Sequence, residues 1–556
     1  MSTVWQVSKD LQKAILDCSE RCLYISMKWA AELLDGIDYD KLEASKDSSD
    51  ANQRYEDCRL LDSSLTELEN NKYLYARALF EVRQFDNAAF VLAQFTAPKL
   101  RFLRLYAKYL AGEKRKEEQS QDIMGPMDDS SADNTELTAI FDELDPLYEN
   151  RELDAFCLYL YGVVLRKRKA NQKATEVLLE SVKEYPYFWS AWMELATMVD
   201  TRKMFQDLQA VLDQTFPKHI MKDLFLAHMA LQLHQPADLF RSLMEPISAS
   251  FPRSTYIKSQ WATLRYDLLE YNEAEELFDE LRNMNPYRLD DMDIFSNLLF
   301  VKDSKEKLSV LAHQSERIDK YRPETCCIIA NYYSVKSEIA KSIEYFKKAL
   351  KLNRNYHLAW TLLGHDYMEM KNSNAAIECY RRAINLNHKD FRAWYGLGQT
   401  YEILKLPYYA IYYYEKSAEL RPHDPRMWVA LGNCFESLDR DNQARDCYKR
   451  ASLCENADKE TAWLRLARVF QKTGNLDAAA TYYKQVLELD EQDRHLNESE
   501  EIGDALLFLA KYEMNRFRYR EASDYAKIAA DFPYPYNEEA KALLEELRAR
   551  GRASNV

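Results

Sequence analysis

The sequence predicts an all-α protein, a solenoid in which one helical hairpin is repeated about 13 or 14 times. Three observations predict this fold class. Only 11 Gly and 15 Pro interrupt the chain of 556 residues, so long stretches of it can be helical. Hydrophobic residues make up 47% of the chain, which is enough for a continuous core. Trp360, Trp394 and Trp428 follow one another at one constant interval, the repeat length of a tetratricopeptide unit.

Four further positions recur in step with these tryptophans. The recurring residues are Gly364, Gly398 and Gly432; Tyr367, Tyr401 and Phe435; Ala376, Ala410 and Ala444; and Tyr380, Tyr414 and Tyr448. The Trp, Leu, Gly and aromatic positions have i, i+3, i+4, i+7 spacing, so they lie on one face of a helix A. The Ala and Tyr positions lie on a helix B in the same way. This is the tetratricopeptide (TPR) pattern, whose hairpins coil into a right-handed superhelix.

The N-terminal region, residues 1–150, contains degenerate repeats. Ala76 and Ala88 mark one helical pair there. A polar insertion is predicted near 113–135, because this charged stretch includes a Gly-Pro break, and a short helix is expected to follow at 136–147. Residues 40–70 are predicted to be a polar, loosely patterned connection.

The repeats become more regular along the rest of the chain. In the middle region, residues 151–321, Trp192 begins a unit one repeat length after the start of the preceding one. Residues 322–548 form the predicted C-terminal superhelix, in which the Trp360 phase continues to Trp463. Residues 549–556 are expected to be a frayed tail.

The charge and the termini exclude several classes of protein. The net charge is -15 and the pI about 5.3, so a general nucleic-acid binder is not expected. The first residues form no signal-type apolar run, and no stretch is apolar enough to span a membrane. We therefore expect neither secretion nor membrane insertion, and a location in the nucleus and cytoplasm.

Common phosphate-binding and catalytic motifs are absent from the sequence. It contains no phosphate-binding glycine loop, no nucleophile elbow and no HExxH motif. Cys18 and Cys22 stand close together without a second pair, and His219, His228 and His234 crowd one region. Structural thiols and ordinary histidines are the simpler interpretation of both groups. We expect no enzyme, no metal and no cofactor.

A ligand is expected on the concave surface, which helix A lines in a helical solenoid. The inward positions are rich in amides and acids. Amides can form hydrogen bonds with a peptide backbone, and acids can pair with arginine. The alternative is a merely solvated groove. The candidate peptide-binding residues are Asn331, His365, Glu369, Tyr395, Gln399, Glu402, Asn433 and Glu436.

The sequence can also be compared with two other functional classes of TPR protein. Domains that clamp a chaperone's C-terminal carboxylate use cations on this surface, and here Arg392 and Arg426 alone would make a weak clamp. A co-chaperone or transport adaptor that reads peptide tails remains the alternative function. A nucleic-acid-associated assembly factor of the half-a-TPR type is disfavoured by the acidic charge and by the ordinary TPR spacing.

Beyond the repeat pattern, the stretches FLRLYAKYLAGEKRKEE and AWYGLGQTYEILK closely resemble the TPR scaffold subunit 8 of the anaphase-promoting complex, or cyclosome. The second stretch matches at positions that the TPR consensus leaves free. The resemblance covers nearly the whole chain, although the repeats after Thr461 match less distinctively.

The resemblance implies a non-catalytic subunit of a multi-subunit ubiquitin ligase that controls mitosis and the cell cycle. It implies a homodimer formed through the N-terminal repeats, and contacts with other subunits of the complex. It also implies that the C-terminal groove takes the C-box of the coactivator, a short motif with arginine and aliphatic residues. The eight candidate residues would then hold that motif.

Overall fold

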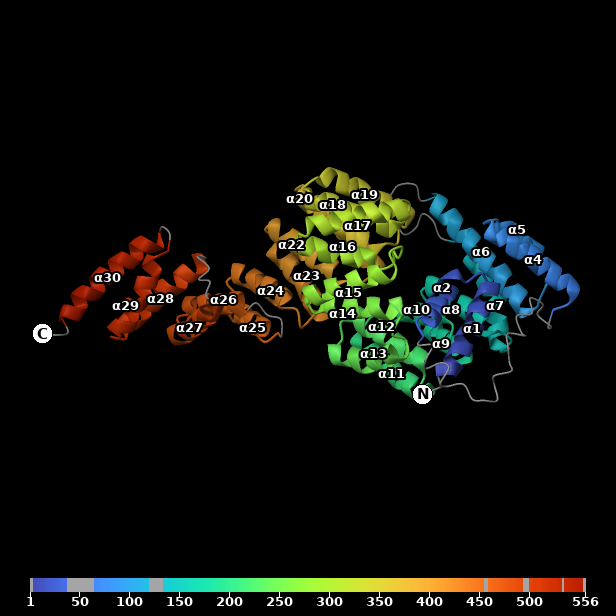
Figure 1. Cartoon of the computed structure of the whole chain (residues 1–556), viewed down its shortest axis with the longest axis horizontal. Coiled ribbons are helices and arrows are strands. Elements are labelled where there is room, and N and C mark those ends of the chain that lie inside the picture. The colour runs from blue at the N-terminus through green and yellow to red at the C-terminus, as the bar shows by residue number, and fades with distance from the viewer. Residues whose placement is uncertain are drawn as a thin grey trace. The chain divides into compact units, whose positions relative to one another are not determined.

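The computed structural model describes residues 4–37, 65–119, 134–454, 459–493, 500–532 and 535–553. These residues form α-helices joined by short turns, with no β-strand among them, so the all-α prediction is confirmed (Figure 1). The chain divides into two compact units, residues 1–354 and 355–556, and each is described separately.

The first unit contains α1 (Val4–Glu20), α2 (Tyr24–Asp35), α4 (Glu67–Glu81), α5 (Phe85–Val91), α6 (Pro98–Gln119), α7 (Glu136–Glu149), α8 (Ala155–Lys167), α9 (Asn171–Glu184), α10 (Trp189–Ala196), α11 (Arg202–Thr215), α12 (Ile220–Gln232), α13 (Ala237–Ser250), α14 (Thr255–Asp267), α15 (Tyr271–Met284), α16 (Met292–Val301), α17 (Lys305–Ile318), α18 (Pro323–Val335) and α19 (Ile339–Leu352).

The second unit contains α20 (His357–Glu369), α21 (Ser373–Leu386), α22 (Phe391–Ile403), α23 (Pro407–Leu420), α24 (Pro425–Ser437), α25 (Asp441–Ser452), α26 (Lys459–Lys472), α27 (Leu476–Asp493), α28 (Glu500–Asn515), α29 (Tyr519–Ala530) and α30 (Tyr536–Ala553). The helices α20 to α29 alternate as helix A and helix B of successive hairpins, as the repeat period predicts.

Close packing within the three hairpins from α20 to α25 depends on a glycine facing a tyrosine. A Cβ atom at Gly398 of α22 would lie 2.5 Å from the ring of Tyr414 on α23, which no real side chain could tolerate. Gly432 and Tyr448 repeat this arrangement one hairpin later, also at 2.5 Å. Both tyrosines are completely buried. The recurring Gly and Tyr of the sequence are therefore one packing unit.

The turn between helix A and helix B has a second recurring feature. Lys371, Lys405 and Asp439, which lie at the same position of successive repeats, adopt the left-handed conformation with φ of 59°, 58° and 56°. Gly474 takes the same role in the next hairpin, with φ of 81°. The sequence pattern did not reveal this position, because the residue type changes from repeat to repeat.

In the first unit, the N-terminal helix α2 packs far along the chain, on α10 and α14. The ring of Trp29 stacks on that of Trp189, with centroids 4.2 Å apart and planes 5° apart, and meets Tyr256 edge-on. The hydroxyl oxygens of Ser26 and Ser190 lie 2.5 Å apart. The start of the chain therefore covers part of its own middle repeats.

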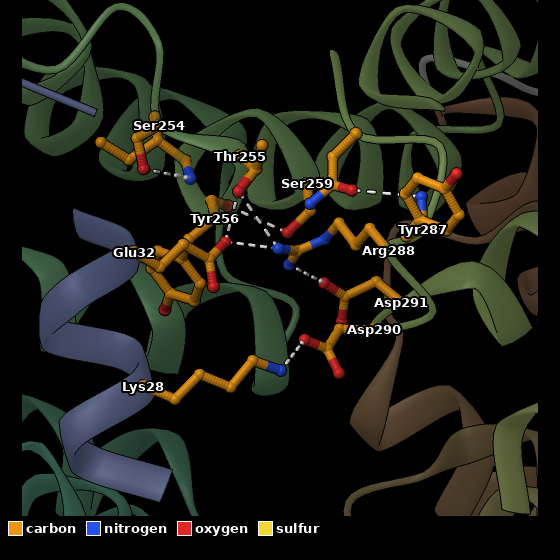
Figure 2. A network of polar contacts seen from close by, with 12 residues as sticks. Lys28, Glu32, Ser254, Thr255, Tyr256, Ser259, Tyr287, Arg288, Asp290 and Asp291 are labelled. Atoms are coloured by element: carbon orange, nitrogen blue, oxygen red, sulfur yellow. Dashed lines mark hydrogen bonds and ion pairs between the residues drawn. The ribbon is translucent and has the colours of Figure 1, made fainter. Parts of the chain in front are cut away.

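A polar network secures the end of α2 (Figure 2). The Arg288 guanidinium bonds to Glu32 of α2, and its other nitrogen lies 3.1 Å from Asp291. The hydroxyl of Thr255 donates to the same Glu32 carboxylate at 2.5 Å. Lys28 pairs with Asp290 beside this cluster. Charges from α2 and from the turn before α16 thus neutralise one another.

Four predictions about irregular regions have different outcomes in the structure. The helix α6 continues to Gln119, into the stretch assigned to the polar insertion, and residues 120–133 lie outside the described residues. The expected short helix is confirmed as α7. Most of the predicted connection at 40–70 also lies outside the described residues. At the other end, α30 extends to Ala553, within the segment predicted to be frayed.

Candidate peptide-binding site

Seven of the eight candidate residues lie in the second unit, on three successive A helices. His365 and Glu369 are on α20, Tyr395, Gln399 and Glu402 on α22, and Asn433 and Glu436 on α24. We call these seven residues the A-helix stripe. Two of these helices are capped, since the side chains of Asp390 and Asp424 accept hydrogen bonds from the first turns of α22 and α24.

Tyrosines of the B helices hold the polar members of the stripe. The hydroxyl of Tyr414 donates to Glu402 Oε2 at 2.6 Å. The hydroxyl of Tyr448 lies 2.7 Å from Asn433 Oδ1 and 2.9 Å from Glu436 Oε2. Burial and the neighbouring carboxylates raise the pKa of both tyrosines, so their hydroxyls stay protonated and can donate. The acids are therefore pre-oriented rather than free to rotate.

His365 belongs to the same pattern. Its Nδ1 atom shares a hydrogen bond of 2.8 Å with the hydroxyl of Tyr380. Burial, with a smaller contribution from the positive charge of Arg392, lowers the pKa of His365 to about 4. The imidazole is therefore neutral at physiological pH, and it can donate to a backbone carbonyl but adds no positive charge to the stripe.

The remaining members differ in exposure. Glu369, Gln399 and Glu402 are exposed. Tyr395 is half-buried, with its ring centroid 5.4 Å from that of Tyr414. Accessible carboxylates and an accessible amide beside an aromatic ring suit a peptide that carries a cation and apolar side chains.

The two arginines of the region are bound to aspartates of their own helix ends. Arg392 Nε lies 3.0 Å from Asp390, and Arg426 Nη2 lies 2.7 Å from Asp424. Their charge is thus offset locally. The stripe keeps the acidic character of its three glutamates, which does not suit a ligand that binds through a terminal carboxylate.

The eighth candidate, Asn331, lies on α18 of the first unit. Its side chain is only 2% exposed, and its Nδ2 atom donates to Ser296 Oγ at 2.8 Å and Asn297 Oδ1 at 2.7 Å. Its role in peptide binding stays a prediction. Unlike the stripe, this amide is already engaged with the neighbouring helix α16.

The hydrogen bonds of the tyrosine hydroxyls are the feature of the candidate site that the sequence did not predict. Tyr380, Tyr414 and Tyr448 were recognised as packing residues only. The available signal was a tyrosine at this position of three successive repeats, where the repeat before them has the equally buried Phe346. Tyr483 extends the series, because its hydroxyl donates to Gln471 at 3.2 Å.

The other groups considered for chemistry stay separate. His219 caps α12, His228 contacts Gln232, and His234 lies 3.6 Å from Asp267. Burial raises the pKa of the Cys18 thiol to about 12, which disfavours the thiolate that binds metals. Within the described ranges, no His, Cys, Asp and Glu residues form a metal-binding group. No helix among these residues combines the length and apolar character needed to cross a membrane.

Comparison with protein families supports the repeat phase. The model of the family "Anaphase promoting complex subunit 8 / Cdc23" matches residues 6–262. Tetratricopeptide-repeat models match 323–356, 391–424 and 460–493, and a further TPR model matches 364–403. The predicted TPR architecture is therefore confirmed.

Individual relatives match over nearly their whole length. Anaphase-promoting complex subunit 8 of Arabidopsis thaliana is 43% identical, over 97% of this chain and 96% of the relative. Anaphase-promoting complex subunit CDC23 of Saccharomyces cerevisiae is 36% identical, over 97% of each chain. The solved APC/C hetero-tetramer Cut9-Hcn1 contains a chain with 18% identity and a TM-score of 0.52, covering 87% of this chain and 97% of that one, which supports the fold.

Proposed function

Because this chain belongs to the family of anaphase-promoting complex subunit 8, or Cdc23, we propose that it is a non-catalytic scaffold subunit of the anaphase-promoting complex. The similarity to subunits of that complex extends over nearly the full length of the chain. Repeated helical hairpins offer long surfaces for protein contacts. A ligase subunit of this kind would work in the nucleus and cytoplasm and would contact other subunits of the complex.

We further propose that the A-helix stripe binds the C-box of a coactivator. The observation that carries this proposal is the set of tyrosine-held acids on α22 and α24. Glu402 is exposed, so it can accept a hydrogen bond from an arginine in addition to the one from Tyr414. Amides at Gln399 and Asn433 supply groups for the peptide backbone.

A binding experiment tests this role. A short synthetic peptide with arginine between aliphatic residues should bind the full-length chain, and Glu402→Gln should weaken binding by about 1–3 kcal/mol. Glutamine keeps an oxygen for the Tyr414 hydroxyl, so the variant removes charge without removing that contact. Glu415→Gln, on the exposed side of α23, is the matched control and should bind like the original chain. Equal affinity for all three proteins would exclude Glu402 from the site.

Homodimerisation through the N-terminal half is the second part of the proposal. Among the aromatic residues of this half, Trp29 and Phe80 are buried within the chain's own fold. Tyr75 and Phe90 are exposed on the hairpin formed by α4 and α5. Exposed aromatic side chains on one hairpin are typical of a surface that contacts another chain.

Light scattering tests the dimer. The full-length chain should give twice its 65.5 kDa mass, and the double variant Tyr75→Glu and Phe90→Glu should give the mass of one chain. Replacing the exposed Tyr287 and Tyr321 with Glu is the matched control and should leave the dimer intact. A full-length chain that is monomeric at micromolar concentration would refute this part of the proposal.

A further inference from the structure

The outer side of α23 and the turn before it form an exposed apolar surface. We call it the α23 patch, and its exposed members are Ile403, Leu404, Leu406, Tyr408, Tyr409 and Tyr412. The three tyrosines are 66%, 60% and 52% exposed. The residues of the patch are separate from those of the A-helix stripe. A cluster of this kind on a helix that should face water indicates contact with another molecule.

The neighbouring hairpins provide an internal comparison. At the positions of Tyr408, Tyr409 and Tyr412, helix α21 has Asn374, Ala375 and Glu378, and helix α25 has Asn442, Gln443 and Asp446. Both neighbours are helices of the same repeat with the same buried Ala and Tyr positions. The hairpin therefore folds without aromatic residues on this side. The three tyrosines of α23 need an explanation other than folding.

The rings of the patch are held in a fixed arrangement. Tyr401 of α22 stacks on Tyr409 with centroids 5.4 Å apart, and on Tyr413 with centroids 5.3 Å apart and planes 2° apart. Tyr412 meets Tyr413 edge-on at 5.2 Å. The buried Tyr401 and the half-buried Tyr413 therefore support the exposed rings of Tyr409 and Tyr412 from below. Supported tyrosine rings offer faces and hydroxyl groups, the combination that binds extended proline-containing peptides. Because the rings are already ordered, binding costs little side-chain entropy.

Positive charge borders the patch from both neighbouring hairpins. Arg381 of α21 donates to the hydroxyl of Tyr401 at 3.1 Å. The Arg440 guanidinium, just before α25, lies 5.7 Å from the centroid of the Tyr408 ring. Lys405 is exposed in the turn that begins the patch. A ligand that crosses these rings would therefore meet cations at both sides, although the whole chain is acidic.

We propose that the α23 patch binds an extended, acidic, proline-containing segment of a partner protein. Prolines would pack between the tyrosine rings, and acidic residues of the ligand would pair with Arg381 and Arg440. This surface would give the chain a second peptide contact, on B helices, in addition to the one proposed for the A helices.

Fluorescence anisotropy with the full-length chain tests the proposal. The probes are three labelled peptides of equal length, which combine proline with glutamate, proline with lysine, and glycine with glutamate. The proline–glutamate peptide should bind at least about tenfold tighter than the other two. The double variant Tyr408→Asn and Tyr412→Gln, which introduces residue types found in the neighbouring helices, should lose about tenfold in affinity for it.

Three further variants make the test specific. Arg440→Gln retains every tyrosine and should weaken binding of the proline–glutamate peptide several-fold. The affinity of a neutral proline peptide, used here as an additional probe, should stay unchanged. Tyr321→Asn, an exposed tyrosine of the first unit, should change nothing. Glu402→Gln should also leave this binding intact, which separates the patch from the A-helix stripe.

Three results would overturn the proposal. The first is equal affinity for the acidic and basic proline peptides, and the second is unchanged affinity in the double tyrosine variant. The third is a fall in particle mass by light scattering in that variant, because the patch would then be a contact between copies of this chain.

Discussion

The hairpins from α20 to α25 and the N-terminal helix α2 are held in place by different kinds of contact. In the hairpins, the hydroxyl contacts join residues close in sequence, as Tyr448 and Asn433 do across 15 positions. Around α2, Ser26 meets Ser190 across 164 positions, and Glu32 meets Arg288 across 256. The first kind of packing is repeated and local, whereas the second is unique and long-range.

This difference should determine how each region responds to a destabilising substitution. In a repeat array, each hairpin is stabilised mainly by its immediate neighbours, so a defect stays local. The position of α2 depends on a few contacts that are not repeated elsewhere in the array. A single substitution can therefore release this helix as a unit. Substitutions in each region test that distinction.

The largest effect is expected for Tyr414→Ala. This fully buried side chain fills the space beside Gly398, so its loss should lower the free energy of unfolding by about 3–5 kcal/mol. Hydrogen exchange should show faster opening of α22 and α23, with α2 unaffected. The exposed Tyr412 supplies the control, since Tyr412→Ala should change stability by less than about 0.5 kcal/mol. Faster exchange in α2 would mean that the defect spreads beyond its neighbours.

Arg288→Ala should destabilise the N-terminal contact by about 3 kcal/mol, because it leaves the carboxylate of Glu32 in the network without its main cation. Hydrogen exchange should increase in α2 and the facing part of α14, while α22 and α23 keep their protection. Arg317→Ala, on the exposed side of α17, is the matched control. Unchanged exchange in α2 would show that the aromatic contacts of Trp29 suffice to hold it.

Acid should weaken the second unit through His365. Its pKa is about 4 in the folded chain, below the ordinary value of 6.5, so the unfolded chain takes up a proton first as the pH falls. The contribution of this histidine to stability is therefore complete above pH 6.5 and falls progressively between 6.5 and 4, by on the order of 2 kcal/mol at pH 5. Thermal unfolding at pH 7 and pH 5 measures this loss. In His365→Gln the loss should be smaller, and an identical loss would assign the pH dependence to other groups.

The smallest effect is expected at the turn before α23. Lys405 has φ of 58°, a conformation that costs a residue with a side chain more than it costs glycine. Lys405→Gly should raise the free energy of unfolding by about 0.5 kcal/mol, measured by urea unfolding. Lys416→Gly, inside α23, should lower it by about 1 kcal/mol. A destabilised Lys405→Gly would show that the lysine side chain contributes packing at this turn.

The sequence predicted the helices of the second unit well and the polar contacts of the site less well. Gly398 was assigned to one face of helix A and Tyr414 to helix B, and the structure shows that these two positions lie directly against each other. Glu402 and Asn433 were assigned to helix A, but their hydroxyl partners were not foreseen. Asn331 was assigned by the same repeat phase, yet it is buried against α16, because Ser296 and Asn297 of that helix accept hydrogen bonds from its amide.

By itself, the sequence determined the hairpin, its repeat period and the positions of its small and aromatic residues. These features follow from the helical spacing of residues close in sequence, which can be recognised in each segment alone. Only the tertiary structure decided that α2 lies on α10 and α14, and that the polar network around Arg288 holds it there. Contacts between segments far apart in the sequence depend on which surfaces meet in the folded chain, and no local pattern encodes that meeting.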